Sequence, residues 1–319
     1  MRVLLATDGS SGASEAARTA GRILRPEHHH MELLCVEPEY PPRMTGWDES
    51  AAGRLRLHRI LDETRQLLDG TAGVLSANGI HAKKHCEIGW PPAVISAASG
   101  RFDLTVVGSE GQGAHSEAGL GPVANHVLHH AAGSVLIGRK LHSETGFRVL
   151  VALDGSLASI RALRAVTTLL DLESAEVTLM NVAETSWIHL GIEYEWIRFR
   201  DRIHDPIEPE IEWDRQVRLE GQRLLDHARE RILPYHPAVE MEVAEGIPSS
   251  EILSEADKRD CDLIVLGATG ATELKHQLLG STSHRIAWDA GCSVLVVRPP
   301  SVNLGESTPE QREIAQVSS

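Results

Sequence analysis

Short apolar runs recur along the chain and are separated by segments long enough to form helices. The runs lie near residues 3, 33, 83, 105 and 136, and again near residues 150, 179, 241, 264 and 295. The run Leu263–Leu266 contains no polar residue, which is typical of a strand buried on both faces of a parallel sheet. Strands that alternate with helix-length segments predict an α/β fold, in which a parallel sheet carries helices on both faces.

The second half of the chain repeats the first at matching distances. Asp8 and Val36 are 28 positions apart, and so are Asp154 and Val182. Near the end of each half, a glycine is followed 14 positions later by a valine of the last apolar run. A unit that recurs at fixed spacing indicates a duplication. We therefore predict two domains of one fold in tandem.

The repeat also sets the predicted domain boundaries, with a first domain over 1–141 and a second over 146–299. The second domain is longer because the connection between its second and third strands has 11 more residues, which predicts a helical insertion at about 184–219. The segment 300–319 has few apolar residues and is predicted to be a mobile tail.

The insertion holds a large share of the aromatic residues of a chain that is poor in them. Packing of an elaborated helix on its own sheet explains these side chains, and the alternatives are an exposed surface for a partner or a lid over the binding loop. The residues are Trp187, Tyr194, Trp196, Phe199 and Trp213.

An Asp-Gly-Ser turn follows the first strand of each half and can cap a helix. The helix-compatible stretches after these turns are Ser14–Leu24 and Ile160–Leu170.

Glycines and hydroxyl side chains gather after the fourth strand of the second half. Gly267, Gly270 and Gly280 follow the buried run, and Ser281 and Ser283 come after the last glycine. A strand end, a glycine-rich loop and a helix start together present backbone N–H groups and a helix dipole to an anion. The pattern predicts a phosphate-binding loop, and the alternative is a loop in which glycines only permit tight turns.

The spacing of this loop is Gly, two residues, Gly, nine residues, then Gly-Ser, and it resembles the nucleotide loop of the universal stress protein family. The resemblance extends from residue 1 to about residue 298. It implies a doubly wound parallel five-stranded sheet of order 3-2-1-4-5 in each domain, and ATP as ligand with a magnesium ion. It also implies that the two domains pair about a pseudo-twofold axis through their final strands. Closed symmetry would favour further association into a homodimer.

The resemblance assigns roles to position-matched residues of the second domain. Asp154 and the turn after it would lie near adenine and ribose, and the backbone at Val182 would border the base. The phosphates would be held by Gly267, Gly270, Gly280, Ser281 and Ser283. The matching residues of the first domain would form a weaker second site, consisting of Asp8, Val36, Gly108, Gly111 and Gly121.

The first loop has fewer donors than the second. Pro122 follows its third glycine and has neither an N–H nor a hydroxyl, whereas the second loop has Ser281 there. Pro122 also suits the first turn of a helix, as expected of a copy kept as scaffold. We predict that the second domain binds ATP and that the first binds it weakly or not at all. The charges of the loops also predict stronger ATP binding by the second domain. The first loop holds two acidic residues, Glu110 and Glu117, whereas the second holds one, Glu273, beside Lys275 and His276.

Composition narrows the classes of function. The chain has 42% hydrophobic and 24% charged residues, and no apolar run reaches the roughly 18 residues of a membrane-spanning helix. A formal net charge of -14 argues against a nucleic-acid partner. Four cysteines without CxxC spacing are expected to be small buried hydrophobes in a reducing compartment. The strand-like run Arg2–Ala6 leaves no room for a signal peptide, so we expect a cytoplasmic protein.

Motifs of catalysis do not accompany the loop. GxxxxGK[ST], SGGxDS and HIGH are all missing from the sequence. We predict a stress-response protein that binds an adenine nucleotide and signals or assembles through it, without catalytic residues and with at most slow hydrolysis. The alternative is a scaffold that binds no nucleotide and acts through protein contacts.

Histidines offer little further chemistry. His126, His129 and His130 have a helical spacing that can hold zinc, but their counterparts in the second half are not histidines, so no metal site is predicted. His28–His30 are expected to lie in a solvated connection.

Overall fold

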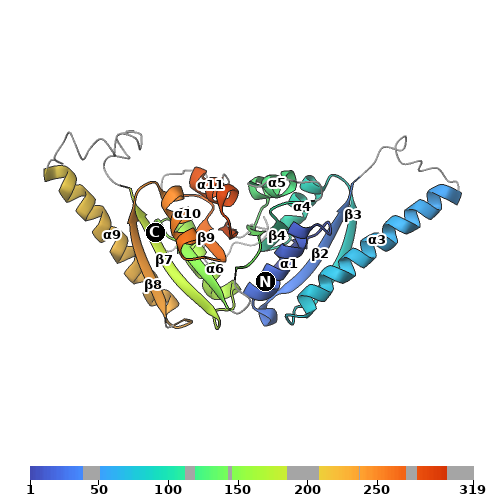
Figure 1. Cartoon of the computed structure of the whole chain (residues 1–319), viewed down its shortest axis with the longest axis horizontal. Helices are drawn as coiled ribbons and strands as arrows, with labels where there is room; N and C mark the ends of the chain where they lie inside the picture. Colours follow the sequence, from blue (N-terminus) through green and yellow to red (C-terminus); the bar gives the residue numbers. More distant parts are fainter. Residues whose placement is uncertain are drawn as a thin grey trace, which may run out of the picture.

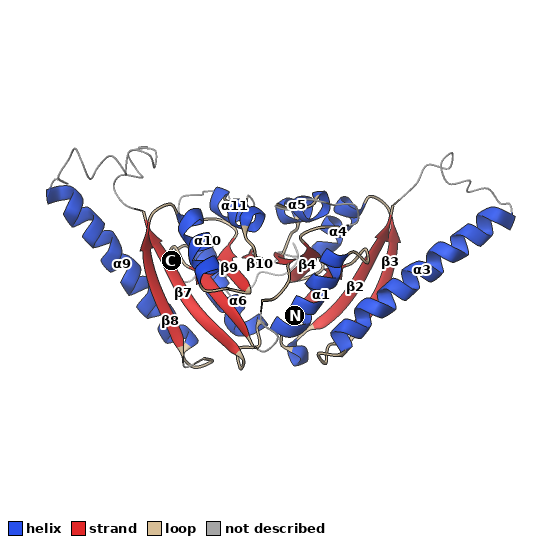
Figure 2. Cartoon of the chain, viewed as in Figure 1, coloured by secondary structure: helices blue, strands red, loops and turns tan. Residues whose placement is uncertain are grey.

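The computed structural model describes residues 1–38, 51–111, 119–142, 146–184, 208–236, 238–270 and 279–299. Its strands form one continuous ten-stranded sheet of order β3-β2-β1-β4-β5-β10-β9-β6-β7-β8 (Figures 1 and 2). Each half contributes five parallel strands in the predicted order 3-2-1-4-5. The predicted fold class is therefore confirmed.

All ten predicted apolar runs are strands. The first half contains β1 (Arg2–Ala6), α1 (Ser11–Ile23), the short 3-10 helix η1 (Pro26–His28), β2 (His30–Glu37), α3 (Ala51–Ser76), β3 (Ala82–Ile88), α4 (Pro91–Ser99), β4 (Leu104–Gly108), α5 (Pro122–His130) and β5 (Ser134–Gly138). The second half contains β6 (Phe147–Ala152), α6 (Leu157–Leu169), β7 (Ala175–Ala183), α9 (Glu208–Ile232), β8 (Val239–Glu245), α10 (Pro248–Lys258), β9 (Leu263–Gly267), α11 (Ser281–Asp289) and β10 (Ser293–Val297).

The first helix of each half begins three residues earlier than the sequence predicted. The Oγ atoms of Ser10 and Ser156 each accept a hydrogen bond of 3.1 Å from the backbone N–H three residues later, and so cap α1 and α6. The glycines of the two Asp-Gly-Ser turns adopt φ angles of +76° and +78°, which side chains rarely allow. Each helix therefore starts directly after its turn.

Two hydrophobic layers hold the helices to the sheet. One face packs against α1, α3, α6 and α9, and the other packs against α4, α5, α10 and α11. Leu5, Leu33, Leu104 and Leu136 on the first face are fully buried. Burial of such a side chain stabilises the fold by about 1.5–3 kcal/mol.

The two halves join through their final strands, as the family resemblance implied. β5 and β10 pair in antiparallel fashion, with Val135 opposite Val296. A second contact lies at the ends of α1 and α6, where Leu24 and Leu170 form an antiparallel bridge. The expectation of solvation is wrong for His29, which is buried at this contact with its Nε2 3.2 Å from the carbonyl oxygen of Leu169.

Two arginines, the half-buried Arg139 and the buried Arg298, cross between the halves at β5 and β10. The Arg139 guanidinium donates to the carbonyl oxygens of Ala287 (2.8 Å) and Cys292 (3.1 Å). Arg298 occupies the matching place in the other half and donates to the carbonyl oxygen of Leu128 (2.5 Å). Burial lowers the pKa of Arg298 to about 10 and also lowers the pKa of Arg139. These reciprocal bonds fix the position of α5 relative to α11.

Helices α5 and α11 lie near the middle of the molecule (Figure 1). Four imidazoles lie close together where these helices meet. We call this group the imidazole cluster: His126, His129 and His130 of α5, and His284 of α11. His126 stacks on His130 with ring centroids 4.1 Å apart, and His129 lies 5.1 Å from His284. Burial lowers the pKa of His126 and of His129, and neighbouring imidazoles, with Arg298 for His129, lower it further.

The lowered pKa values predict a pH-dependent stability. As pH falls below the ordinary histidine value of 6.5, the unfolded chain takes up protons before the folded chain, so the free energy of unfolding declines. We expect the melting temperature to fall between pH 7.5 and pH 5.5, and to fall less in His129→Gln, by a small amount because the His129 side chain is exposed to solvent. His81→Gln, at an exposed histidine outside the cluster, serves as control. Equal falls in all three proteins would show that His129 makes no such contribution.

Candidate functional site

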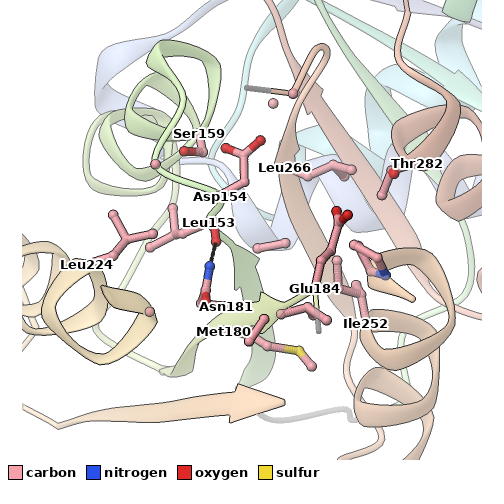
Figure 3. A pocket seen from close by; sticks show the side chains of 18 of the residues that line it. Leu153, Asp154, Ser159, Met180, Asn181, Glu184, Leu224, Ile252, Leu266 and Thr282 are labelled. Atoms are coloured by element: carbon pink, nitrogen blue, oxygen red, sulfur yellow. Dashed lines mark hydrogen bonds between the residues drawn. The ribbon is translucent and has the colours of Figure 1, made fainter. Parts of the chain in front are cut away.

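A pocket of about 540 Å³ opens at the carboxyl ends of β6, β7 and β9 in the second half (Figure 3). This is the edge at which parallel α/β sheets bind ligands. All seven residues that the sequence assigned to the second-domain site line this pocket: Asp154, Val182, Gly267, Gly270, Gly280, Ser281 and Ser283.

Asp154 lies between the first turn and the glycine loop. Its Oδ1 accepts a hydrogen bond of 3.0 Å from the N–H of Ser156, which fixes the carboxylate at the start of α6. Its Oδ2 faces the loop, because a Cβ atom added to Gly270 would lie 3.3 Å from it. A ligand that reaches the loop therefore passes next to this carboxylate.

Gly267 has a packing role at the end of β9. A Cβ atom there would lie 2.7 Å from both the backbone carbon and the Cβ of Ala158. Only glycine lets α6 approach the strand this closely. The sequence pattern assigned Gly267 to the loop, whereas the structure makes it the last residue of β9, and the pattern gave no sign of this contact.

The first turn of α11 points backbone N–H groups toward the pocket. Gly280 is its N-cap and, within the described residues, no side chain caps the helix. The first-turn N–H groups have no intrahelical acceptor, so they are available to an anion. The hydroxyl of Ser283 donates to the carbonyl oxygen of Gly267 (2.7 Å), so Ser283 can offer only its N–H. Ser281 and Thr282, which also carry hydroxyls, line the pocket at this helix start.

Strand β7 and helix α9 supply residues that sequence reasoning missed. Asn181 is buried and donates from Nδ2 to the carbonyl oxygen of Leu153 (2.7 Å), the bond drawn in Figure 3. A polar residue inside the run that ends at Val182 was a signal that it has a specific partner. Glu220 and Gly221 reach the pocket from α9, far away in sequence, and no local pattern indicates this.

The lining of this pocket is acidic. Its carboxylates are Asp154, Glu184 and Glu220, and the described lining residues include no lysine, arginine or histidine. Figure 3 shows Asp154 and Glu184 pointing into the same space. An anionic ligand would therefore be bound by N–H and hydroxyl groups, with a cation to offset the carboxylates.

Several residues named from the sequence lie outside the described residues. They are the loop residues Glu117, Glu273, Lys275 and His276, the aromatic residues Trp187, Tyr194, Trp196 and Phe199, the side chain of Trp213, and the tail 300–319. The comparison of loop charges and the role of the insertion thus stay predictions.

A second pocket, of about 600 Å³, occupies the matching place in the first half. Its described lining holds four carboxylates, one more than the other pocket, and again no basic residue. Pro122 takes the first position of α5, as predicted. The five residues assigned to the weaker site all line this pocket: Asp8, Val36, Gly108, Gly111 and Gly121.

The remaining candidates carry less chemistry. Over the described ranges, no group of three or more potential ligands is placed to hold a metal ion, so His126, His129 and His130 are not arranged as a zinc site. All four cysteines are free, and Cys86 alone is exposed. Burial raises the pKa of the other three thiols to about 12, as expected of small buried hydrophobes.

No helix in the described part of the chain is both long and apolar enough to span a bilayer.

Fold and pockets together define a tandem α/β protein with a pocket at the strand ends of each half. The model of the Universal stress protein family matches residues 1–139 and 147–298, and the chain belongs to this family.

Relatives and solved structures agree with this assignment. Over 155 residues, the chain is 33% identical to Universal stress protein YxiE of Bacillus subtilis, covering 47% of this chain and 98% of the relative. It is 30% identical over 154 residues to Universal stress protein MJ0531 of Methanocaldococcus jannaschii, covering 48% and 82%. The crystal structure of a universal stress protein from Archaeoglobus fulgidus matches with a TM-score of 0.62 at 20% identity, covering 93% of this chain and 98% of that one. The last match shows the fold alone.

Proposed function

We propose that the C-terminal pocket binds ATP, with a magnesium ion, and that the bound state controls signalling or assembly during the stress response in the cytoplasm. The observation that carries the proposal is the uncapped start of α11, with the hydroxyls of Ser281 and Thr282, on the wall of a pocket of about 540 Å³. The phosphates would bind there through the N–H groups of the first turn.

The rest of the pocket fits the other parts of the nucleotide. Met180, Val182 and Ile252 provide an apolar wall for adenine, and Asp154 provides an acceptor for ribose hydroxyls. The carboxylates of the lining favour a hydrated magnesium ion beside the phosphates, because an all-oxygen environment suits this ion. Binding rather than catalysis is proposed, since the described lining offers no cationic clamp for phosphoryl transfer.

Titration of the purified full chain with ATP and magnesium tests the proposal. We expect saturable heat with one ATP per chain, and adenine nucleotide in the supernatant when protein purified without added ligand is denatured. A turnover assay on the same sample should show at most slow hydrolysis. If neither heat nor released nucleotide is found, the alternative of a scaffold that acts through protein contacts is favoured.

A further inference from the structure

The two pockets share the wall that would face a base and a ribose. Leu34, Val36 and Ile95 line the N-terminal pocket at the positions that Met180, Val182 and Ile252 hold in the C-terminal one. The two first-strand aspartates also have the same geometry. Oδ1 of Asp8 accepts from the N–H of Ser10 at 2.9 Å, and its Oδ2 lies 3.0 Å from the place of a Cβ atom on Gly111.

The wall that would face phosphates is different. Pro122, Val123 and Ala124 stand where α11 has Ser281, Thr282 and Ser283, so this helix start has one N–H fewer and no hydroxyls. In the loop itself, Glu110 replaces Thr269. A phosphate group would meet a carboxylate in place of a hydroxyl donor.

The backbone holds Glu110 in this position. Its carbonyl oxygen accepts from the Oγ of Ser10 at 3.4 Å and lies over Gly12, where a Cβ atom would be only 2.3 Å away. The second half has Ala158 at the place of Gly12, so its loop cannot settle onto the helix in the same way. These two contacts therefore hold the backbone of Glu110 in a fixed place beside the pocket.

Acceptors dominate the N-terminal pocket. Asp8, Glu37, Glu63 and Glu110 line it, and the second half has alanine at the place of Glu37. Ionised carboxylates only accept hydrogen bonds, and they repel phosphate oxygens. A neutral ligand that is rich in hydroxyl and amino donors can donate to these carboxylates without a charge conflict.

We propose that the N-terminal pocket binds an uncharged nucleoside and excludes its phosphorylated forms. The base would lie on the wall of Leu34, Val36 and Ile95, the ribose hydroxyls would donate to Asp8, and the free 5′-hydroxyl would donate to Glu110. The volume of about 600 Å³ is ample for such a ligand. The assignment of base and ribose rests on the proposed function of the C-terminal pocket, from which the orientation is taken.

Calorimetry with adenosine tests this inference on the full chain. The C-terminal pocket is first saturated with ATP and magnesium, and adenosine is then titrated. We expect one further equivalent to bind, with at least 10-fold weaker affinity in Asp8→Ala. Absence of adenosine heat, or uptake of two ATP molecules by the wild type, overturns the inference.

A gain of function provides the second test. The double variant Glu110→Thr with Pro122→Ser gives these two positions the residues that the C-terminal half has there, and we expect it to bind a second ATP while its adenosine affinity falls. An unchanged ATP stoichiometry in a folded double variant counts against phosphate exclusion by these residues. The two proposals fail separately: adenosine heat that Asp8→Ala removes supports the nucleoside site even if no ATP binds.

Discussion

Gly270→Asp is expected to weaken ATP binding by at least about 100-fold, which corresponds to about 2.7 kcal/mol. The new side chain would start 3.3 Å from Oδ2 of Asp154 and place a second carboxylate where the phosphates of the proposed ligand would enter. Like charges a few ångströms apart in a partly buried site repel by about 1–4 kcal/mol. Titration calorimetry with ATP and magnesium measures the loss.

Two control variants accompany this experiment. The first tests whether charge or side-chain size weakens ATP binding, and the second tests which pocket binds ATP. Gly270 has no left-handed φ, and Asp154 Oδ2 is the only atom near its Cβ position in the described structure, so Gly270→Asn should fold and keep most of the affinity. Gly111→Asp makes the same change in the N-terminal pocket and should leave the ATP heat unchanged. Equal heats in the wild type and in Gly270→Asp would contradict a phosphate site at this loop.

Most of the strands could be predicted from the sequence because they are short, apolar and bounded by turn residues, whereas β3 is polar and exposed. The run Leu263–Leu266 is buried over its whole length, as its composition predicted. The antiparallel join of β5 to β10 was different. Nothing in Ser134–Gly138 specifies the direction of its second neighbour, and only the family resemblance implied it.

The sequence predicted the glycine loop of the candidate site but not the residues of other elements that line the same pocket. Local spacing identifies a glycine loop because the glycines and hydroxyls are neighbours in sequence. It cannot show that Glu220 of α9 lies at the same pocket, since that depends on the packing angle of a long helix. Glu184 and Glu220 reduce the difference in charge between the two pockets that the loops alone suggested. The two pockets still differ at Glu110, which adds a carboxylate, and at Pro122, which removes an N–H and a hydroxyl. Both differences would disfavour a phosphate group.

The packing of α9 on β7 is the second feature with a large expected effect, and Gly221 controls it. A Cβ atom at Gly221 would lie 2.3 Å from Oδ1 of Asn181 and 3.4 Å from a methyl group of Val243. Asn181 cannot turn away without losing its bond to the carbonyl oxygen of Leu153. Gly221→Ala therefore has to move α9 outward, and we expect a loss of about 1–3 kcal/mol in the free energy of unfolding. Because α9 also lines the pocket, ATP affinity should fall in the same variant.

Gly70→Ala is the matched control, because Gly70 lies inside α3, the equivalent long helix of the first half, with no atom within 4 Å of its Cβ position in the described structure. There the methyl group only raises helix propensity, so this variant should gain about 0.5–1 kcal/mol. Urea denaturation of the two variants and the wild type measures both changes, and calorimetry measures ATP binding. Opposite signs are expected from one chemical change, since the two helices differ in what their glycines touch. If Gly221→Ala were as stable as Gly70→Ala and bound ATP normally, the close approach of α9 to Asn181 would not shape the pocket.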